Sequence, residues 1–363
     1  MKIIAFHLYN DFSGSPRVLE QILSGLASKY TNIHIYLYTS SGLGALSSLS
    51  KNSNITIKSF SYTFTQNKYL TTLKFIYAQL FMFFCSFRYL FQKDVTFYVN
   101  TLLPFMPAIA AKIMGKSLVY HYHENALIKG KFYLILCRLM ERIANKIICV
   151  SNNQSLTLKR RKNVYTVYNA VAPNSLTYNK FEVNHRFKAK NVLMISSLKL
   201  YKGISEFLQL AKEMPNYNFT LVINERQEKI NQFFGCYQLS VPFNVKIYPR
   251  QKNVYPFYNN ASILLNLSDK TKFVETFGLT ALEALSCGIP VIVPTVGGIA
   301  EIVEDNKTGF KIDVQHLDLI ERKIAYLLSD EFKYIIFSEQ AKLYSKKFNI
   351  ENVIADIYNI ITK

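Results

Sequence analysis

Two glutamates, Glu275 and Glu283, flank the segment of this sequence that is best suited to chemistry. The segment is ETFGLTALE, and the ALSCGIPVIV that follows it places a glycine at 288 and a proline at 290. This spacing predicts a loop up to Gly278, a helix over about 279–286 and a strand directly afterwards. In parallel α/β sheets, ligands bind beyond the carboxyl ends of the strands. The start of this helix is therefore expected to face a ligand.

The start of the helix offers two kinds of group to a ligand. The first amides of a helix lack partners within it and carry positive dipole, so those of Phe277, Gly278 and Leu279 suit a phosphate oxygen or a sugar hydroxyl. Carboxylates only accept hydrogen bonds, which suits polyols, so Glu283 is expected to hold a ribose diol and Glu275 a transferred sugar. Taken alone, the two glutamates would equally be solvent-facing residues favoured by the helix dipole.

The residues around the glutamates are more specific than the pair itself. FGL stands between them, CGIPV follows them, and GGI-x-E begins at Gly297. With these motifs the segment resembles family 4 of the retaining GT-B glycosyltransferases, and the resemblance covers most of 190–315. It implies a nucleotide-sugar site in the second domain, an acceptor site mainly in the first, and neither a catalytic metal nor another cofactor.

The loop after the apolar run at 192–196 carries the expected cations. Its sequence is SSLKLYKG, which resembles the diphosphate-binding loop of this family, and Lys202 matches the lysine of the family's KG pair. Cations fixed on a nucleoside diphosphate stabilise the charge that develops as the glycosidic bond breaks. Ser197 stands where many family members carry arginine, so Lys199 is expected to replace that cation. Outside this pattern, both lysines would be interpreted as solvated loop residues.

Two segments of the first half complete the expected site. Gly14 and Ser15 follow the first strand and resemble a degraded form of the family's first-loop GG motif, although the proline after them also suits an ordinary helix start. His121 and His123 alternate with Tyr122 at the end of a strand, so both histidines are expected on the same side of it. His123 resembles the family histidine that reaches the donor sugar, whereas a lone strand histidine is more often structural.

Short β-branched apolar runs alternate with helical stretches along both halves of the chain. The expected strands are Ile3–His7, Ile33–Tyr38, Ile55–Ser59, Val95–Val99, Leu118–Tyr122, Ile147–Val150, Val164–Tyr168, Val192–Ser196, Phe219–Ile223, Val245–Tyr248, Ile263–Leu267, Ile289–Val293 and Phe310–Ile312. This pattern predicts an α/β protein with two Rossmann-like, doubly wound parallel-sheet domains, which the GT-B resemblance implies face a cleft. We expect an acceptor-side domain over 1–172, a nucleotide-sugar domain over 173–345, and a C-terminal helix over 346–363 that is able to pack back on the first domain.

The positive charge of the chain is concentrated in its first half. The net charge is +19 overall, with +16 on residues 1–180 and +3 on residues 181–363. Such an asymmetry predicts a large anionic partner, either a membrane surface or a nucleic acid. The absence of an RNP or helix-turn-helix signature disfavours nucleic acid. The apolar segment Leu70–Phe91 is then either a core helix or an interfacial helix on anionic lipid, since its unbroken apolar part is too short to span a bilayer.

The remaining composition limits the class of protein. Hydrophobic residues make up 50% of the chain, which argues against disorder, and the five cysteines form no CxxC pair that would indicate a zinc or redox site. The N-terminal MKIIAFHLYN resembles a first strand and not a secretory signal. We therefore expect a cytoplasmic protein associated peripherally with the inner face of the cell membrane.

Together these features predict a retaining hexosyltransferase with His123, Glu275 and Lys202 as catalytic residues. The expected donor is a UDP- or GDP-linked sugar, and the expected acceptor is a glycan or a polyprenyl-diphosphate-linked oligosaccharide. The expected pathway is the synthesis of a bacterial surface polysaccharide such as lipopolysaccharide O-antigen, capsule or exopolysaccharide. The alternatives are a GT-B epimerase or phosphorylase that uses the same phosphate cleft and, from another class, a basic nucleic-acid-binding protein.

Overall fold

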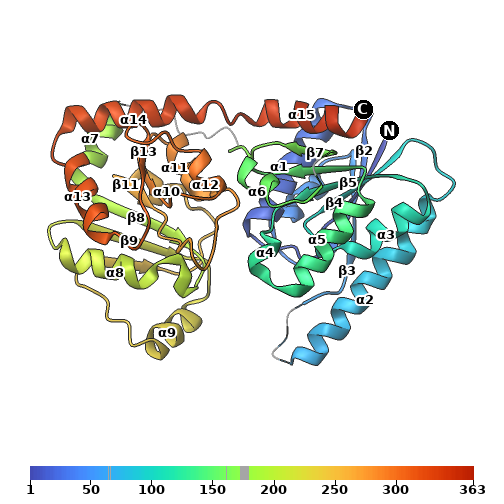
Figure 1. Ribbon diagram of the computed structural model, residues 1–363, viewed down its shortest axis with the longest axis horizontal. Coiled ribbons are helices and arrows are strands. Elements are labelled where there is room, and N and C mark those ends of the chain that lie inside the picture. The colour runs from blue at the N-terminus through green and yellow to red at the C-terminus, as the bar shows by residue number, and fades with distance from the viewer. Residues whose placement is uncertain (64, 66, 161, 172–179) are drawn as a thin grey trace. The chain divides into compact units, whose positions relative to one another are not determined.

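The computed structural model shows two α/β units, each built on its own parallel sheet (Figure 1). The first unit comprises Met1–Ala172 and Ile350–Lys363, and the second comprises Pro173–Asn349. The structure describes all residues except 64, 66, 161 and 172–179, so the domain boundary predicted between 172 and 173 lies outside the described residues. The presence of two parallel-sheet units confirms the predicted fold class.

The first unit has a seven-stranded parallel sheet with the order β3-β2-β1-β4-β5-β6-β7. Its strands are β1 (Lys2–Phe6), β2 (His34–Ser40), β3 (Ile55–Phe60), β4 (Val95–Asn100), β5 (Ser117–Tyr122), β6 (Lys146–Cys149) and β7 (Val164–Thr166). Its helices are α1 (Gly14–Lys29), η1 (Ala45–Lys51), α2 (Lys68–Ser86), η2 (Phe87–Tyr89), α3 (Phe105–Ile113), α4 (Ala126–Lys129), α5 (Lys131–Ile143), α6 (Asn152–Leu156) and α15 (Ile350–Thr362). Every residue of β4 is buried, and successive strand residues point to opposite faces, so both faces of this sheet are covered.

The last helix, α15, packs on α1 within the first unit. Tyr30, directly after α1, stacks on Tyr358 with ring centroids 3.7 Å apart. Lys146 donates a hydrogen bond to the carbonyl oxygen of Ile360 at 2.5 Å. The helix begins at Ile350, later than expected, because a tight turn closes the preceding helix.

The second unit has a six-stranded parallel sheet with the order β10-β9-β8-β11-β12-β13. Its strands are β8 (Asn191–Ser196), β9 (Asn218–Ile223), β10 (Val245–Tyr248), β11 (Ile263–Leu265), β12 (Val291–Val293) and β13 (Gly309–Lys311). Its helices are α7 (Lys180–Ala189), η3 (Leu200–Lys202), α8 (Ile204–Glu213), α9 (Gln227–Cys236), α10 (Tyr255–Asn259), α11 (Leu279–Ser286), α12 (Gly298–Glu301), α13 (Leu317–Leu327) and α14 (Glu331–Ser345). The strands expected from the sequence are all present in the two units, with bounds that differ by at most two residues.

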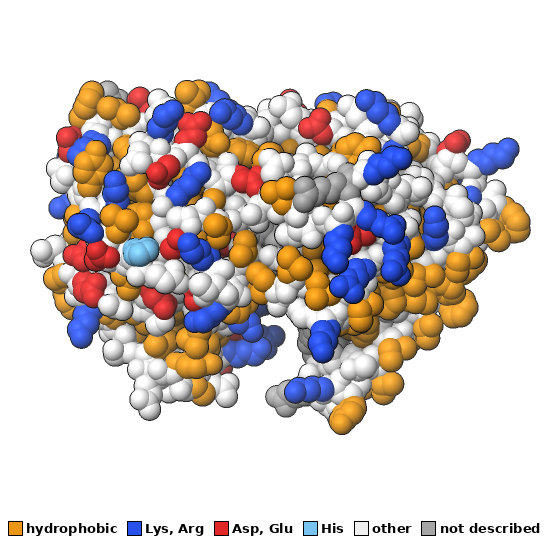
Figure 2. All heavy atoms as spheres, viewed as in Figure 1, with side chains coloured by type: hydrophobic (Ala, Val, Ile, Leu, Met, Phe, Trp, Pro, Cys, Tyr) orange, Lys and Arg blue, Asp and Glu red, His pale blue; other side chains and the backbone are white. Residues whose placement is uncertain are grey.

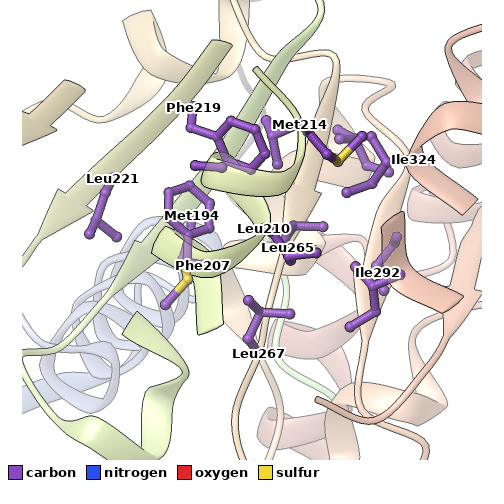
Figure 3. Packing of buried hydrophobic residues seen from close by; sticks show 14 of the residues in the cluster. Met194, Phe207, Leu210, Met214, Phe219, Leu221, Leu265, Leu267, Ile292 and Ile324 are labelled. Atoms are coloured by element: carbon purple, nitrogen blue, oxygen red, sulfur yellow. The ribbon is translucent and has the colours of Figure 1, made fainter. Parts of the chain in front are cut away.

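The core of the second unit lies between this sheet and its helices (Figure 3). Phe207 of α8 meets Phe219 of β9 edge to face, with ring centroids 5.2 Å apart. Leu265 of β11 and Ile292 of β12 lie in the same cluster. These two strands end at the site described below, so the packed core sets the positions of the loops that follow them.

Helix α2 leaves much of its apolar surface exposed. Its buried residues are Ala78, Gln79, Met82 and Ser86, a single stripe along the helix. Its exposed large hydrophobic residues are Tyr69, Leu70, Leu73, Ile76, Tyr77, Leu80 and Phe84. Within the described part of the chain, Lys68–Tyr89 is the one helix whose length and composition would also suit a membrane span. The core-helix interpretation therefore accounts for only one side of α2.

Candidate active site

The strand order of the second sheet reverses between β8 and β11, and the predicted donor residues follow these two strands. Such a reversal opens a crevice beyond the carboxyl ends of the strands, which is where ligands bind in open α/β sheets. Lys202 lies on the loop after β8, and the loop after β11 runs from Asn266 to the start of α11 and includes Glu275. The structure thus brings together two residues that are 73 positions apart.

Glu275 is the centre of a hydrogen-bonded cluster in the second unit. Lys202 Nζ lies 2.5 Å from its Oε1, and the two side chains are only 13% and 16% exposed. The hydroxyl of Ser268 donates to the same oxygen at 3.0 Å, and the amide of Asn266 donates to it at 3.3 Å. The ammonium group of Lys202 also lies 3.9 Å from the ring centroid of Phe273.

The charge of Glu275 is set by a balance of two effects. Burial disfavours the carboxylate and would raise the pKa of Glu275, but Lys202 and the two neutral donors outweigh it, so the pKa lies below its ordinary value. Glu275 is therefore ionised at neutral pH. A partly buried carboxylate of this kind needs its cation, because an uncompensated charge in such a place is costly.

The helix that follows Glu275 has the predicted bounds. Helix α11 spans Leu279–Ser286, and its N-cap Gly278 has a φ of +90°. A Cβ at this position would lie 2.5 Å from a side-chain carbon of Ile299, so both the backbone conformation and the space require glycine. The carbonyl of Glu275 accepts a hydrogen bond from the amide of Gly298 at 2.8 Å. The GG motif is thereby held against the start of α11.

Glu283 lies one turn into α11 and has a donor inside the protein. The hydroxyl of Tyr258 donates to its Oε2 at 2.6 Å. Burial, reinforced by the neighbouring carboxylate, raises the pKa of Tyr258 well above its ordinary value, so this hydroxyl keeps its proton. The predicted contact between Glu283 and a ribose remains a prediction.

The other predicted donor residues differ in exposure. Phe277 is buried and its ring lies 6.4 Å from that of Phe348, edge to face. Ser197 and Lys199 are exposed on the loop between β8 and η3. Their assignment to the donor phosphates also remains a prediction, while Lys202 is the loop cation that contacts Glu275.

In the first unit, the predicted residues Ser15 and His123 are linked by Asn100, which the sequence analysis did not name. The strand order reverses between β1 and β4, so this point is also a crevice at the carboxyl edge. The amide oxygen of Asn100 lies 2.9 Å from Nε2 of His123. The amide nitrogen lies 3.0 Å from Nδ1 of His7 and 3.4 Å from the carbonyl oxygen of Ser15, the residue after Gly14.

The two strand histidines lie on the same side of β5, as predicted. The rings of His121 and His123 are 4.1 Å apart, and the hydroxyl of Tyr98 lies 2.8 Å from Nδ1 of His121. Burial lowers the pKa of His121 to about 3 and that of His7 to about 4. Burial and these two neighbours lower the pKa of His123 well below its ordinary value. All three rings are therefore neutral at neutral pH.

Glu124 supports the backbone of the turn that follows β4. Both of its carboxylate oxygens accept from the amide of Leu102, at 3.1 and 3.2 Å. Burial raises the pKa of Glu124, and Lys129 opposes that effect. Between Asn100 and Leu102, Thr101 has a φ of +74°, which non-glycine residues rarely adopt. His123 contacts Asn100 and Glu124 contacts Leu102, so these two neighbouring residues hold both sides of the strained Thr101.

The sequence contained a signal for the residues that were missed. Asn100 ends the run VTFYVN, and Asn266 and Ser268 follow the run ILL, so each is a polar residue at the carboxyl end of an apolar strand. Such positions line ligand crevices in parallel sheets. Among the residues that the structure describes, no group of three or more His, Cys, Asp or Glu side chains is arranged to hold a metal ion.

Comparison with known proteins agrees with this geometry. Residues 177–346 match the family model for glycosyl transferases group 1. An uncharacterized glycosyltransferase of Methanocaldococcus jannaschii is 28% identical over 240 residues, which is 64% of this chain and 63% of that protein. The capsular polysaccharide biosynthesis glycosyltransferase CapM of Staphylococcus aureus is 27% identical over 273 residues, 67% of this chain and 70% of that protein. The first of these alignments spans less than two thirds of its relative.

The fold has close structural neighbours. The crystal structure of Anabaena HepE in complex with UDP and glucose has a TM-score of 0.79 over all of both chains, at 19% identity. Two doubly wound parallel sheets are the architecture of the GT-B fold. This chain therefore has the GT-B fold of these structures, and its second unit is similar to the group 1 glycosyl transferases.

Proposed function

We propose that this protein is a retaining, family 4 glycosyltransferase that moves a hexose from a UDP- or GDP-linked donor to a glycan or lipid-linked acceptor. The observation that carries the proposal is the pairing of Lys202 with Glu275 where the strand order of the second sheet reverses. The HepE complex contains UDP and glucose, and CapM acts in capsular polysaccharide biosynthesis. These two proteins support a nucleotide-sugar donor and a role in bacterial surface polysaccharide synthesis.

The protein donors around Glu275 reach one of its two carboxylate oxygens, which supports a substrate contact for the other. Within the described residues, the hydrogen bonds from Lys202, Asn266 and Ser268 all reach Oε1. Oε2 is then the oxygen that accepts from a hydroxyl of the transferred sugar. Three protein donors already converge on Oε1. A side chain with a single acceptor oxygen, such as glutamine, would therefore have no second oxygen left to accept from the sugar.

Lys202 supplies the charge that the leaving group needs. An ammonium group has three donors, and Glu275 takes one of them. The ammonium group also lies over the ring of Phe273, and we expect its remaining N–H groups to donate to oxygens of the donor diphosphate, whose negative charge grows as the glycosidic bond breaks. In the front-side mechanism proposed for this family, a donor phosphate oxygen takes the acceptor proton, so the protein contributes position and charge and no nucleophile.

The first test is nucleotide release from a panel of UDP-, GDP- and dTDP-sugars with a glycan acceptor. Glu275→Ala and Lys202→Ala are expected to lower kcat/KM by about 100-fold, as loss of one transition-state contact does in other enzymes. Lys272→Ala is the matched control, since Lys272 lies on the same loop but is 70% exposed and pairs with Asp269. Wild-type turnover in the first two variants would refute the assignment.

Product analysis separates the proposed reaction from its alternatives. A retaining transferase gives a glycoside with the anomeric configuration of the donor and needs an acceptor for turnover. An epimerase would convert the nucleotide sugar without any acceptor, and a phosphorylase would consume inorganic phosphate. Inversion at the anomeric carbon, or turnover independent of acceptor, would exclude the retaining transferase.

Helix α2 supports an acceptor that is held at a membrane surface. Figure 2 shows hydrophobic side chains over the part of the surface where α2 lies in Figure 1. Leu73 and Phe84, for example, are 63% and 67% exposed. Lys68 and Arg88 are exposed at the two ends of this stretch, which contains no acidic residue. An exposed apolar stripe flanked by cations suits the interface of an anionic bilayer, where polyprenyl-diphosphate acceptors reside.

Flotation of the whole chain with phosphatidylglycerol-containing vesicles tests this part of the proposal. The wild type is expected to float at moderate salt, and a Leu73→Ser/Phe84→Ser variant is expected to stay in the soluble fraction. Phe332→Ser is the matched control, because Phe332 is 73% exposed but lies in the second unit. A wild type that remains soluble, or a control that loses flotation equally, would contradict membrane association through α2.

A further inference from the structure

Asn100 is fully buried and connects three segments of the first unit. Its amide nitrogen donates to Nδ1 of His7 and to the carbonyl oxygen of Ser15, at 3.0 and 3.4 Å. Its amide oxygen lies 2.9 Å from Nε2 of His123. A single side chain at the end of β4 therefore contacts the segment after β1, the start of α1 and the segment after β5.

The carbonyl of Ser15 decides which way the amide of Asn100 faces. A carbonyl oxygen only accepts hydrogen bonds, so the NH2 group of Asn100 must face it. The amide oxygen of Asn100 then faces His123, and because that oxygen also only accepts, Nε2 of His123 must carry the hydrogen. In a neutral imidazole the other nitrogen, Nδ1, is then an acceptor.

The surroundings hold this arrangement in place. Burial and the neighbouring histidines keep the pKa of His123 well below its ordinary value, so the ring does not gain a second proton at neutral pH. The next residue after Asn100, Thr101, has a φ of +74°, and its amide donates to the carbonyl of His121 at 2.9 Å. Strained backbone persists only where several contacts determine it, and it gathers at functional sites.

We propose that Asn100 is a positioning residue that holds His123 in the Nε2–H tautomer, so that Nδ1 accepts a hydrogen bond from a hydroxyl of the sugar substrate. This inference rests on the proposed glycosyl transfer and refines it. An acceptor nitrogen attracts a hydroxyl hydrogen and repels a phosphate oxygen. His123 therefore recognises the polyol part of the substrate, while binding of phosphate belongs to cations such as Lys202.

Nitrogen-15 NMR of the histidine-labelled whole protein tests the tautomer without any substrate. The chain has six histidines, and the signals of His123 are those lost in a His123→Gln variant. At pH 7.5 we expect Nε2 to show the shift of a protonated ring nitrogen and Nδ1 that of an unprotonated one. The opposite pattern, or an imidazolium, in the wild-type spectrum would overturn the proposal.

Variants at position 100 then test whether the tautomer matters for transfer. Asn100→Asp keeps the shape and an acceptor for His123 but cannot donate to Ser15 or His7, so the new carboxylate stabilises a doubly protonated His123 ring. We expect the NMR signals to move to the imidazolium pattern and kcat/KM to fall about tenfold, the value of one hydrogen bond. Tyr98→Phe removes the hydroxyl that contacts His121. We expect it to leave the nitrogen-15 shifts of His123 unchanged and kcat/KM within twofold of wild type.

Each outcome of these experiments has a defined meaning. Wild-type turnover in Asn100→Asp with an imidazolium at His123 would overturn the link between tautomer and transfer. An equal loss of turnover in Asn100→Asp and Tyr98→Phe would show that both residues act only through the packing of the unit, which would overturn the positioning role of Asn100. The NMR result in the wild type stands even if no sugar of the panel is turned over, so a failure of the proposed function is distinguishable from a failure of this inference.

Discussion

Removing Lys202 is expected to destabilise the second unit, and removing Glu275 with it is expected to restore most of the stability. Among the residues that the structure describes, the Lys202→Met variant leaves the carboxylate of Glu275 with two neutral donors, Ser268 and Asn266. Breaking a buried ion pair costs about 3–5 kcal/mol when one charge is left uncompensated. Because both side chains keep 13–16% exposure, we expect the lower end, about 3 kcal/mol.

The double variant separates the structural role of the pair from its role in binding. In Lys202→Met/Glu275→Gln no charge is left without a partner, so the loss is expected to shrink to about 1 kcal/mol, which is about 2 kcal/mol less than in Lys202→Met alone. Turnover is not expected to recover, because Gln and Met can neither hold the diphosphate nor replace the carboxylate. The double variant should be stable and inactive.

Urea unfolding followed by circular dichroism, with nucleotide release measured on the same preparations, gives both quantities. Lys272→Met serves as the control, since its exposed pair with Asp269 should contribute less than 1 kcal/mol. Additive losses in the single and double variants would refute the ion pair as a stabilising contact. Wild-type turnover in the double variant would refute the assignment of the pair to the donor.

Three further predictions follow from the geometry of the two units. In Gly278→Ala, an alanine would have to adopt a φ of +90° with its Cβ 2.5 Å from Ile299. We expect the free energy of unfolding to fall by about 2 kcal/mol and calorimetry to show a lower Tm. An unchanged Tm would contradict the strain. Tyr258→Phe removes a 2.6 Å donor from a carboxylate that is expected to bind ribose, so KM for the donor should rise with little change in kcat, and an unchanged KM would exclude that role. Stability should also fall as the pH drops below 6.5, because the unfolded chain then binds more protons than a folded chain with histidine pKa values near 4 at His7 and 3 at His121. At pH 5 each of these histidines removes about 2 kcal/mol, so a urea midpoint that stays constant from pH 8 to 5 would contradict their burial.

The confirmed predictions concern features that depend on residues close together in the sequence. The helix over 279–286 follows from Gly278 before it and Gly288 after it, which act on their immediate neighbours. The same-side placement of His121 and His123 follows from the two-residue period of any strand. The parallel sheets follow from alternating apolar runs and helices, since parallel strands require such crossovers.

The predictions that fell short concern side chains that meet from distant segments. From the sequence, Lys202 is expected on a phosphate and Glu275 on a sugar, and only the fold shows that the two side chains contact each other. An apolar helix with the composition of α2 suits both a protein core and a membrane interface, so the sequence leaves both interpretations open. The packing of α2 against its neighbours decided that Met82 is buried and Phe84 is exposed.

By itself, the sequence determined the class of fold, the start of the donor helix and the concentration of positive charge in the first half. These features depend on residue periodicity, on the glycines and prolines that end helices and strands, and on composition, all of which can be read without the tertiary structure. Only the tertiary structure decided that Asn100 joins Ser15 to His123 and that one oxygen of Glu275 collects three donors. Those contacts depend on the order in which the parallel strands lie side by side, and the apolar pattern of each strand is the same in any order.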